Sequence, residues 1–458
     1  MKIRLLSCLV LAASTACYLT SCSTDSEEVA PGDQSVESLG FTNRIVDIFT
    51  DEELLPDLQI RTGAGTEAYT AENRFGLNWL SSAPSIVSVA ADGTIRAEAL
   101  GTSRISARTP DNQKQASLTV NVLETDPLDD PLTRSMIYTS GHMLSDNSVM
   151  QSFDLGADSY LYCSQVGRGS NNYNVIILRK QANSSSYESR MLLPYSGHGN
   201  NIALEQEGSD TYVWVGSYGT RSSEGDYTLS QTIARIKYTP GRTFTPAECY
   251  EQYWIPQRRN LQASLDPDND IILFWCTNSN YSTRYIYLYR LSEVKALPES
   301  SEQLSFSITW GGESGGAPSV TEKPTVMVKN LSQLEPLATI TLPQNSPLTV
   351  GTSGNQGHDV KNGKIYYYEG AGNNNDGTSL STATVSIFDF GGNLIRRHDI
   401  AAIRDMSALA AQGLTTTGYM EPEGIKYHDG VLYCGFASRS TDDVRRAVVL
   451  QYDLMAEE

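Results

Sequence analysis

Short runs that alternate apolar and polar residues, separated by turns rich in Gly, Asn and Asp, recur from about residue 41 to the C-terminus. In the run Ala116–Val122, the side chains of Leu118, Val120 and Val122 share one face, because strand side chains alternate with a period of two. One short stretch, 401–412, has a helical pattern. The pattern therefore predicts an all-β protein.

The first β-rich region, residues 41–123, predicts a small β-sandwich. Asp92-Gly93 is a hairpin-turn signal between two strand-like runs. This turn, Trp79 before it, the Ser81–Ser85 motif and the Gly101-Thr102 step occur in an order that resembles group 2 bacterial Ig-like domains. The resemblance implies a spacer or stalk in a protein displayed outside the cell. An acidic linker, 124–133, follows.

The second region, residues 134–458, contains five repeats of one plan: a strand with a polar head, an aromatic-rich strand and a β-branched strand. The aromatic members are Tyr160–Cys163, Tyr212–Val215, Ile271–Cys276, Ile365–Tyr368 and Val431–Cys434. Repetition of sheet-sized units around an axis leaves few exposed strand edges. The repeats therefore predict a five-bladed β-propeller, interrupted by an insertion at 299–344. In Tyr366–Tyr368, the alternation predicts at least one buried and one exposed ring.

Four motifs of this region resemble one propeller family: Met150–Phe153, Gly197–Gly199, Tyr212–Trp214 and Glu421–Ile425. The family is shared by staphylococcal phage receptor-binding proteins and teichoic acid biosynthesis protein C-like proteins, and helveticin-type bacteriocins are similar to it. The resemblance implies a five-bladed propeller and, for the phage members, recognition of a cell-wall glycopolymer. From it we expect a glycan-facing propeller.

The first residues have the pattern of a secretory signal, with Lys2 and Arg4 before a short apolar run. Leu19-Thr20-Ser21-Cys22 resembles the bacterial lipobox, which implies a signal peptide at 1–21 and acylation of Cys22. The acidic cluster at 25–28 resembles the surface-export signal of Bacteroidetes-type lipoproteins. We therefore expect a lipid anchor in the outer membrane, a flexible acidic linker at 22–40 and exposure at the cell surface.

Charge and cysteine content narrow the range of partners. With 53 acidic and 34 basic residues the net charge is −19, which argues against a nucleic-acid partner, since phosphates would repel the chain. Tyr is frequent, 25 against 10 Phe, which suits a carbohydrate-facing protein. The cysteines beyond the leader have no metal-ligand spacing. They are Cys163, Cys249, Cys276 and Cys434. We expect buried free thiols, with one disulfide as the alternative.

The candidate ligand-binding residues are the polar heads of the five expected inner strands. They are Gln151, His198, Asn200, Gln262, Gln356, His358, Glu421 and Glu423. Inner strands of a propeller begin at one face of the central channel, and amides, imidazoles and carboxylates there suit sugar hydroxyls. The main hypothesis is therefore glycan binding at this channel mouth. The alternative is a water-filled channel whose polar groups bind one another.

Two further functions remain open at this point. The first is a polysaccharide lyase in which His198 or His358 is the base and an arginine neutralises a uronate. The arginines near the expected loops are Arg168, Arg221 and Arg259. A glycosidase using Glu421 and Glu423 is disfavoured, because residues two apart on a strand share a face about 7 Å apart and Pro422 favours a turn. The second is a protein-interaction propeller.

No cofactor is expected from the sequence. The segment Asp266–Asp270 matches the start of a calcium loop but lacks the glycine at its sixth position. We therefore interpret it as a hairpin turn, with calcium binding as the alternative.

Overall fold

The computed structural model describes residues 35–125, 136–139, 148–167, 174–182, 184, 186–219, 230–249, 251–310, 320–344, 346–350, 354–373, 380–441 and 445–455. For residues 136–139 and 174 it describes the backbone alone. The expected leader, Cys22, Arg168 and Arg221 lie outside this part of the chain, as do residues 126–133 of the expected linker. The prediction of an all-β protein is confirmed.

Residues 35–125 form a β-sandwich with three small sheets, ordered β1-β4-β5, β2-β10-β9-β6 and β3-β8-β7. The strands are β1 (Val36–Phe41), β2 (Ile45–Phe49), β3 (Glu53–Leu54), β4 (Leu58–Thr62), β5 (Gly65–Ala68), β6 (Asn78–Ser81), β7 (Val87–Val89), β8 (Ile95–Ala97), β9 (Gly101–Arg108) and β10 (Gln115–Leu123). Leu118, Val120 and Val122 are buried, as the alternation predicts. Gly93 has φ +88°, and a Cβ there would lie 2.6 Å from the Trp79 ring, so the tryptophan packs on the turn.

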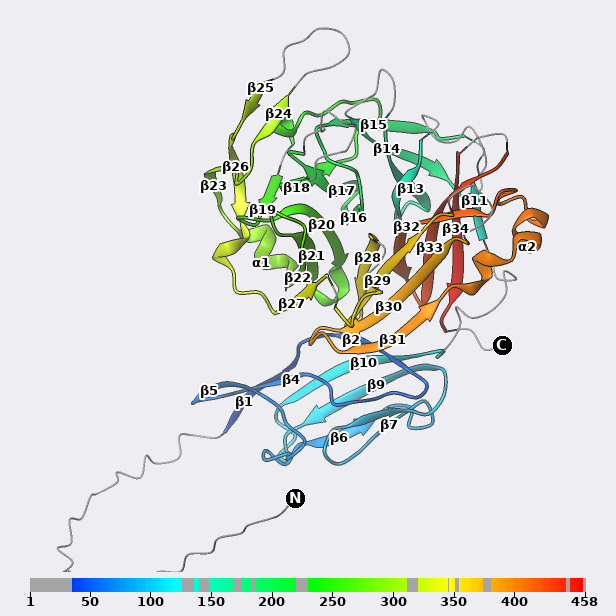
Figure 1. The fold of residues 1–458 in the computed structure, drawn as a ribbon. Coiled ribbons are helices and arrows are strands. Elements are labelled where there is room, and N and C mark those ends of the chain that lie inside the picture. Colours follow the sequence, from blue (N-terminus) through cyan, green and yellow to red (C-terminus); the bar gives the residue numbers. More distant parts are fainter. Residues whose placement is uncertain are drawn as a thin grey trace, which may run out of the picture.

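The remaining strands build a β-propeller, in which the described residues form five sheets of at least four strands (Figure 1). The first three sheets contain β12 (Met150–Leu155), β13 (Tyr160–Val166), β14 (Asn174–Gln181) and β15 (Ser189–Pro194); β16 (Ala203–Glu207), β17 (Asp210–Ser217), β18 (Thr232–Lys237) and β19 (Glu251–Trp254); and β20 (Arg259–Asp266), β21 (Ile271–Thr277), β22 (Thr283–Arg290) and β27 (Ala338–Pro343). The last two contain β28 (Asn355–Lys361), β29 (Lys364–Ala371), β30 (Thr382–Asp389) and β31 (Leu394–Asp399); and β32 (Tyr419–His428), β33 (Val431–Arg439), β34 (Arg445–Asp453) and β11 (Met136–Thr139). Because β11 pairs with β34, the first propeller strand completes the last sheet.

The insertion lies between the third and fourth strands of the third sheet, β22 and β27; it begins with a helix and partly joins the second sheet. It contains α1 (Leu291–Ala296), β23 (Glu299–Gln303), β24 (Ile308–Trp310), β25 (Val320–Glu322) and β26 (Thr325–Asn330). Strand β26 pairs in parallel with β19 and extends the second sheet to six strands. The expected helical stretch 401–412 is a 3₁₀ turn, Ala401–Arg404, followed by α2 (Met406–Ala411).

The five innermost strands close a ring in the order β12, β16, β20, β28, β32, with β32 returning to β12. The ring is tight at its centre. A Cβ on Gly357, which has φ +150°, would lie 2.9 Å from the Cα atom of Gly424, so two inner strands touch through their backbones. The middle of the propeller axis is therefore packed, and a ligand must approach from one of its two ends.

The sandwich packs directly against the propeller. Phe49 and Leu123 are buried in the same apolar cluster as Tyr366 and Tyr427 of the propeller. The sequence suggests a separate stalk joined by a linker, but the structure places the sandwich beside β30 and β31 (Figure 1). The physical reason is that its edge strand presents Phe49 as an apolar contact, which is stable only when covered.

The cysteines are free thiols, as expected among the residues described. Cys163, Cys276 and Cys434 are buried and Cys249 is half-buried. Burial raises the pKa of Cys163 to about 12.

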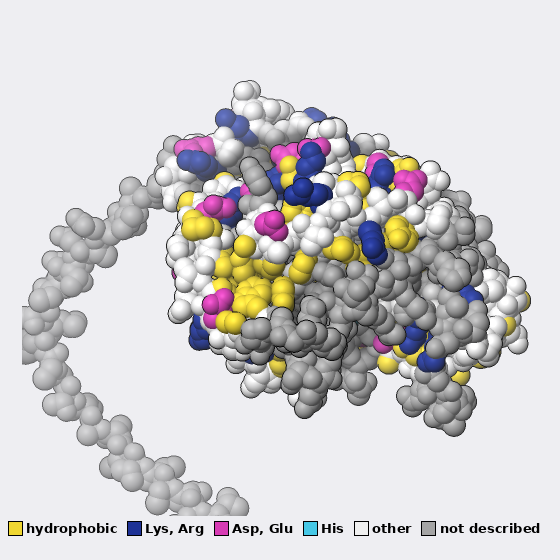
Figure 2. All heavy atoms as spheres, turned by 90° about the horizontal axis from the view of Figure 1, so that it is seen from above, with side chains coloured by type: hydrophobic (Ala, Val, Ile, Leu, Met, Phe, Trp, Pro, Cys, Tyr) yellow, Lys and Arg dark blue, Asp and Glu magenta, His cyan; other side chains and the backbone are white. Residues whose placement is uncertain are grey.

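No single sign of charge dominates the described surface that faces the viewer in Figure 2. Acidic and basic side chains alternate there around a patch of hydrophobic side chains, and no histidine is visible among the coloured atoms. The net charge of −19 is therefore not concentrated in one field on this face.

Candidate functional site

A cavity of about 630 Å³ lies at the end of the propeller axis where the inner strands finish. All five sheets contribute to its lining, through residues such as Asp154, Glu205, Leu265, Asp359 and His428. These residues lie near the C-terminal ends of β12, β16, β20, β28 and β32 or in the middle of those strands. The cavity is therefore a channel mouth built by the same strands that the sequence singled out, but at their opposite ends.

An imidazole–carboxylate pair stands at the centre of this mouth. The Nε2 atom of His428 lies 2.9 Å from Oδ1 of Asp154. Asp154 also accepts a hydrogen bond of 2.8 Å from the backbone N–H of Leu204, on the neighbouring inner strand. The Asp154 side chain is 7% exposed, whereas that of His428 is 38% exposed. The carboxylate therefore holds the ring at Nε2, while the His428 side chain stays partly exposed.

The negative charge of Asp154 and the positive charge of protonated His428 stabilise each other. Burial alone would raise the pKa of Asp154, but the attraction of Lys426 and the bond from His428 outweigh it, so this pKa lies below its usual value. Burial alone would lower the pKa of His428, but Asp154 outweighs it and the pKa is raised. The protonated form of the partly exposed His428 is thus favoured by Asp154.

Behind this pair lies a second one, Lys426 and Asp359. The Lys426 ammonium is 3.9 Å from Oδ1 of Asp359, and its side chain is 2% exposed. It has no hydrogen-bond partner among the described residues. Asp359 accepts a 2.8 Å bond from the backbone N–H of Tyr427. Burial, with a smaller contribution from Asp154, raises the pKa of Asp359 to about 6.

One wall of the cavity holds the segment that resembles a calcium loop. Its residues Pro267–Asn269 form a 3₁₀ turn. The ammonium of Lys361 lies 3.1 Å from Oδ1 of Asp266 and 2.6 Å from Oδ2 of Asp268. Lysine thus holds the position that a cation would need, and the described residues contain no group of three metal-ligating side chains. The segment is a hairpin turn, as the sequence predicts.

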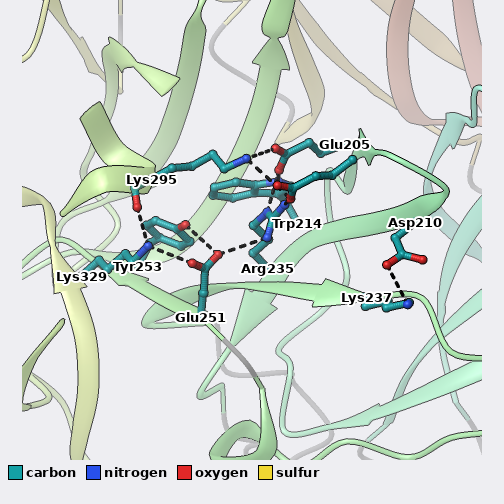
Figure 3. A network of polar contacts seen from close by, with 10 residues as sticks. Glu205, Asp210, Trp214, Arg235, Lys237, Glu251, Tyr253, Lys295 and Lys329 are labelled. Atoms are coloured by element: carbon teal, nitrogen blue, oxygen red, sulfur yellow. Dashed lines mark hydrogen bonds and ion pairs between the residues drawn. The ribbon is translucent and has the colours of Figure 1, made fainter. Parts of the chain in front are cut away.

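The neighbouring part of the wall, on the second sheet, is stabilised by a buried ionic network (Figure 3). Arg235 on β18 lies 2.7 Å from Glu205 and 3.3 Å from Glu251, with its own side chain 5% exposed. Lys295 of α1 also contacts Glu205, and Lys329 of β26 lies 2.8 Å from Glu251. The network connects the insertion to the second sheet. It also occupies Glu205 with cations of this chain.

The predicted residues lie in the middle of the axis and at its other end. His358 is fully buried, with Nδ1 2.9 Å from Oγ of Ser264, and burial lowers its pKa well below the usual value. Gln151 and Gln262 are also buried. His198 is half-buried, and burial lowers its pKa to about 4. His358 thus lacks the exposed surface that a ligand contact requires.

The remaining members of the predicted ring are also enclosed to different degrees. Asn200, Gln356 and Glu421 are half-buried, and Glu423 is buried. Burial, assisted by the nearby Glu421, raises the pKa of Glu423 well above its usual value. Glu421 accepts a hydrogen bond from the Tyr419 hydroxyl. Part of the ring is thus occupied by contacts within the chain, as the alternative reading of the sequence supposed.

The sequence reasoning did not select the residues of the cavity. Asp154 and Asp359 lie only three residues beyond Gln151 and Gln356, on the same inner strands. His428 is the last residue of β32, directly before the Asp429-Gly430 turn. The missed signal is that the inner strands are polar at both ends.

Comparison with known proteins gives one distant relative. Over 290 residues the chain is 21% identical to the putative major teichoic acid biosynthesis protein C of Bacillus subtilis, a match that covers 62% of this chain and 53% of that protein. The chain thus spans about half the length of this relative. No family model matches the chain.

Among solved structures, the similarities are of low score. A Trichoderma reesei carbohydrate-active enzyme of family AA12 has TM-score 0.30 and 12% identity, covering 71% of this chain and 97% of its own. The β-propeller domain of the Pyrococcus furiosus Trilobed protease has TM-score 0.24 and 9% identity, covering 88% and 90%. An α-L-arabinofuranosidase of Clostridium thermocellum has TM-score 0.25 and 11% identity, covering 64% and 82%. These scores carry no functional information, and the propeller assignment rests on the strand order described above.

Proposed function

We propose that this protein is a lipid-anchored surface protein whose propeller binds a glycan in the channel mouth lined by Asp154 and His428. The observation that carries the proposal is the cavity itself. Its volume of about 630 Å³ is within the range of ligand sites, and polar side chains from four of the five sheets converge on it. Sugar hydroxyls need a donor and an acceptor in a small space, which imidazole, carboxylate and amide groups supply.

Two further observations support a carbohydrate ligand. The half-buried ring of Tyr433 lies edge-on to His428, with 6.0 Å between ring centroids, and both line the cavity. Aromatic faces of this kind pack on the apolar side of a sugar ring. In addition, the distant relative is named for teichoic acid biosynthesis.

The location is part of the same proposal. The lipobox-like residues ending at Cys22 and the following acidic cluster motivate an outer-membrane anchor and surface display. The Ig-like reading of the sandwich fits a protein of this kind. The described residues contain no helix that is long and apolar enough to cross a membrane.

A second candidate function is cleavage of the glycan. The observation that favours it is that two neighbouring carboxyl groups have pKa values shifted in opposite directions. The pKa of Asp154 is lowered and that of Asp359 is raised. Such a split is the arrangement that acid–base catalysis uses. The partly exposed His428, held by Asp154, adds a proton acceptor at the cavity surface.

One experiment tests both functions. The full chain is incubated with a panel of neutral and acidic polysaccharides and analysed by size-exclusion chromatography with refractive-index detection. Binding moves the protein into the polymer peak and leaves the polymer length unchanged. Shortened polymer would support cleavage instead. A panel in which no polymer shifts or shortens would overturn the glycan proposal.

A further inference from the structure

The charges that line the cavity are unbalanced. Four lining side chains are carboxylates: Asp154, Glu205, Asp359 and Asp429. Two are lysines: Lys361 and Lys426. Glu205 is paired with Arg235 and Lys295, Asp154 with His428 and Asp359 with Lys426, whereas Asp429 makes no ion pair among the described residues. A ligand that enters the mouth therefore meets a negative environment inside a chain of net charge −19.

Neither lysine is presented to a ligand. Lys361 lies between Asp266 and Asp268, and although burial lowers its pKa, the attraction of Asp266 outweighs this and raises the pKa above its usual value. The Lys426 side chain is 2% exposed and faces Asp359. A cation that already neutralises carboxylates of its own chain has little attraction left for an incoming anion.

The polar groups that do reach the cavity surface are acceptors or weak donors. The exposed lining side chains include Ser159, Gln206 and Asp429, beside the partly exposed His428. Gln206 donates from Nε2 to the carbonyl of Gly208 and accepts from the hydroxyl of Thr211 at 3.1 Å, so its amide is fixed in place. Such a set can exchange hydrogen bonds with hydroxyl groups, whereas the exposed Asp429 repels a carboxylate, sulfate or phosphate and the charge of His428 is already balanced by Asp154.

Resting on the proposed glycan function, we infer that the cavity selects an uncharged, hydroxyl-bearing sugar and rejects glycans that carry anionic groups. In the bound state, the sugar hydroxyls donate to the Asp429 carboxylate and to the Gln206 carbonyl oxygen, and exchange a hydrogen bond with Nδ1 of His428. The rejection of anions is electrostatic. It must therefore weaken as salt screens the exposed Asp429.

The test uses matched polymers, so that only ligand charge changes. Each neutral polymer of the panel (dextran, xylan, mannan and arabinan) is compared with its carboxymethylated and sulfated derivative, and binding to the full chain is measured by biolayer interferometry in 20 mM and 500 mM NaCl. At low salt we expect the charged derivatives of the bound polymer to bind at least about tenfold more weakly. At high salt the difference should shrink.

Two variants assign the effect to the cavity. Asp429→Asn keeps a residue that tolerates the local φ of 48° and removes one carboxylate, so it should narrow the difference between neutral and charged polymer. His428→Gln should weaken binding of the neutral polymer by about tenfold through loss of the imidazole contact. Glu37→Gln, which removes an exposed carboxylate of the sandwich, is the matched control. It should change neither the affinity for the neutral polymer nor the difference in affinity between neutral and charged polymer.

The outcomes separate the inference from the function on which it rests. Charged derivatives that bind as well as, or better than, the neutral polymer would overturn the inference and leave glycan binding intact. If both cavity variants are folded by circular dichroism and still prefer the neutral polymer as strongly as the parent chain does, the inference is overturned as well. Absence of binding to every polymer would overturn the proposed function and this inference together.

Discussion

The Nδ2 atom of Asn362, in a propeller turn, donates a hydrogen bond of 2.9 Å to Oδ1 of Asp47, on strand β2 of the sandwich. Asp47 is fully buried, and its Oδ1 also accepts a 2.9 Å bond from Asn121 of β10. Its pKa is raised to about 6, because burial outweighs the hydrogen bonds. A carboxyl group at the domain contact therefore titrates at mildly acidic pH.

This shift predicts a dependence of stability on pH. The folded pKa of Asp47 lies above the ordinary value of 3.8 for an aspartate, so its stabilising contribution is complete below that value and is lost as pH rises through about 6. The pKa of Asp359 is also raised to about 6, so its contribution to stability is lost over the same pH range. We expect Asp47 and Asp359 each to lower the free energy of unfolding by on the order of 2 kcal/mol between pH 4 and pH 7. Urea titrations at a series of pH values measure this slope.

The variant Asp47→Asn keeps the acceptor oxygen and removes the titration. Between pH 4 and pH 7 its free energy of unfolding should fall by on the order of 2 kcal/mol less than that of the parent chain, because the other titrating groups remain. A variant with the full parental slope would show that Asp47 does not titrate in this window. Asp111→Asn, on an exposed loop of the sandwich, is the control.

The contact of the sandwich with the propeller predicts a large effect of Phe49→Ala. Phe49 is 1% exposed and packs in one cluster with propeller residues. Loss of a buried phenylalanine costs about 3–5 kcal/mol. Leu80→Ala, at a position that is 49% exposed, should change stability by less than about 1 kcal/mol. Urea denaturation of both variants makes the comparison. Equal stability of the two would show that the domains fold without support from each other.

The ionic network on the cavity wall predicts a contrast between two cationic residues. Arg235→Met removes the more deeply buried of the two cations that contact Glu205 and leaves Lys295 in place, and it should cost about 3–5 kcal/mol. Lys237→Met breaks a pair whose lysine is 53% exposed and should cost no more than about 1 kcal/mol. Thermal unfolding monitored by circular dichroism compares them. A small loss in Arg235→Met would mean that water reaches Glu205 and replaces the arginine.

Thiol burial predicts slow modification of the native protein. Cys163, Cys276 and Cys434 are fully buried, and burial raises the pKa of Cys163 to about 12, so little thiolate is present at pH 8. In the region after the leader, Ellman's reagent should modify at most Cys249 in the folded chain. All four thiols should react in guanidinium chloride. Fewer than four in the unfolded chain would indicate a disulfide.

The period-two pattern and the repeated turns were sufficient to predict the strands, because a sheet with one buried face determines alternation locally. These patterns did not predict burial correctly where a side chain is covered by strands that are distant in sequence. In Tyr366–Tyr368 the alternation predicted an exposed ring, yet all three tyrosines are fully buried, because β29 lies inside its sheet and adjacent elements cover both faces. The docking of the sandwich depends on Phe49 meeting a propeller surface far away in sequence, which no local pattern encodes.

The position of the candidate site also depends on contacts between residues that are distant in sequence. Inner strands were identified from their polar heads, but which end of each strand opens into a cavity depends on how five backbones pack at the axis. Close approach of Gly357 and Gly424 closes the middle of the axis. The Asp154–His428 pair joins residues 274 positions apart, and only the closure of the ring brings them together.

The seam between sandwich and propeller has a mechanical consequence. A pull on the N-terminal end while the cavity holds a ligand is transmitted through the sandwich, and part of it crosses the seam at Asp47–Asn362 and at the Glu52–Lys364 ion pair. These contacts flank the β28–β29 turn, next to Lys361 in the cavity wall. If the chain is anchored and binds a glycan as proposed, tension reaches the cavity wall beside Lys361, and the lifetime of attachment under flow depends on these domain contacts as well as on the cavity.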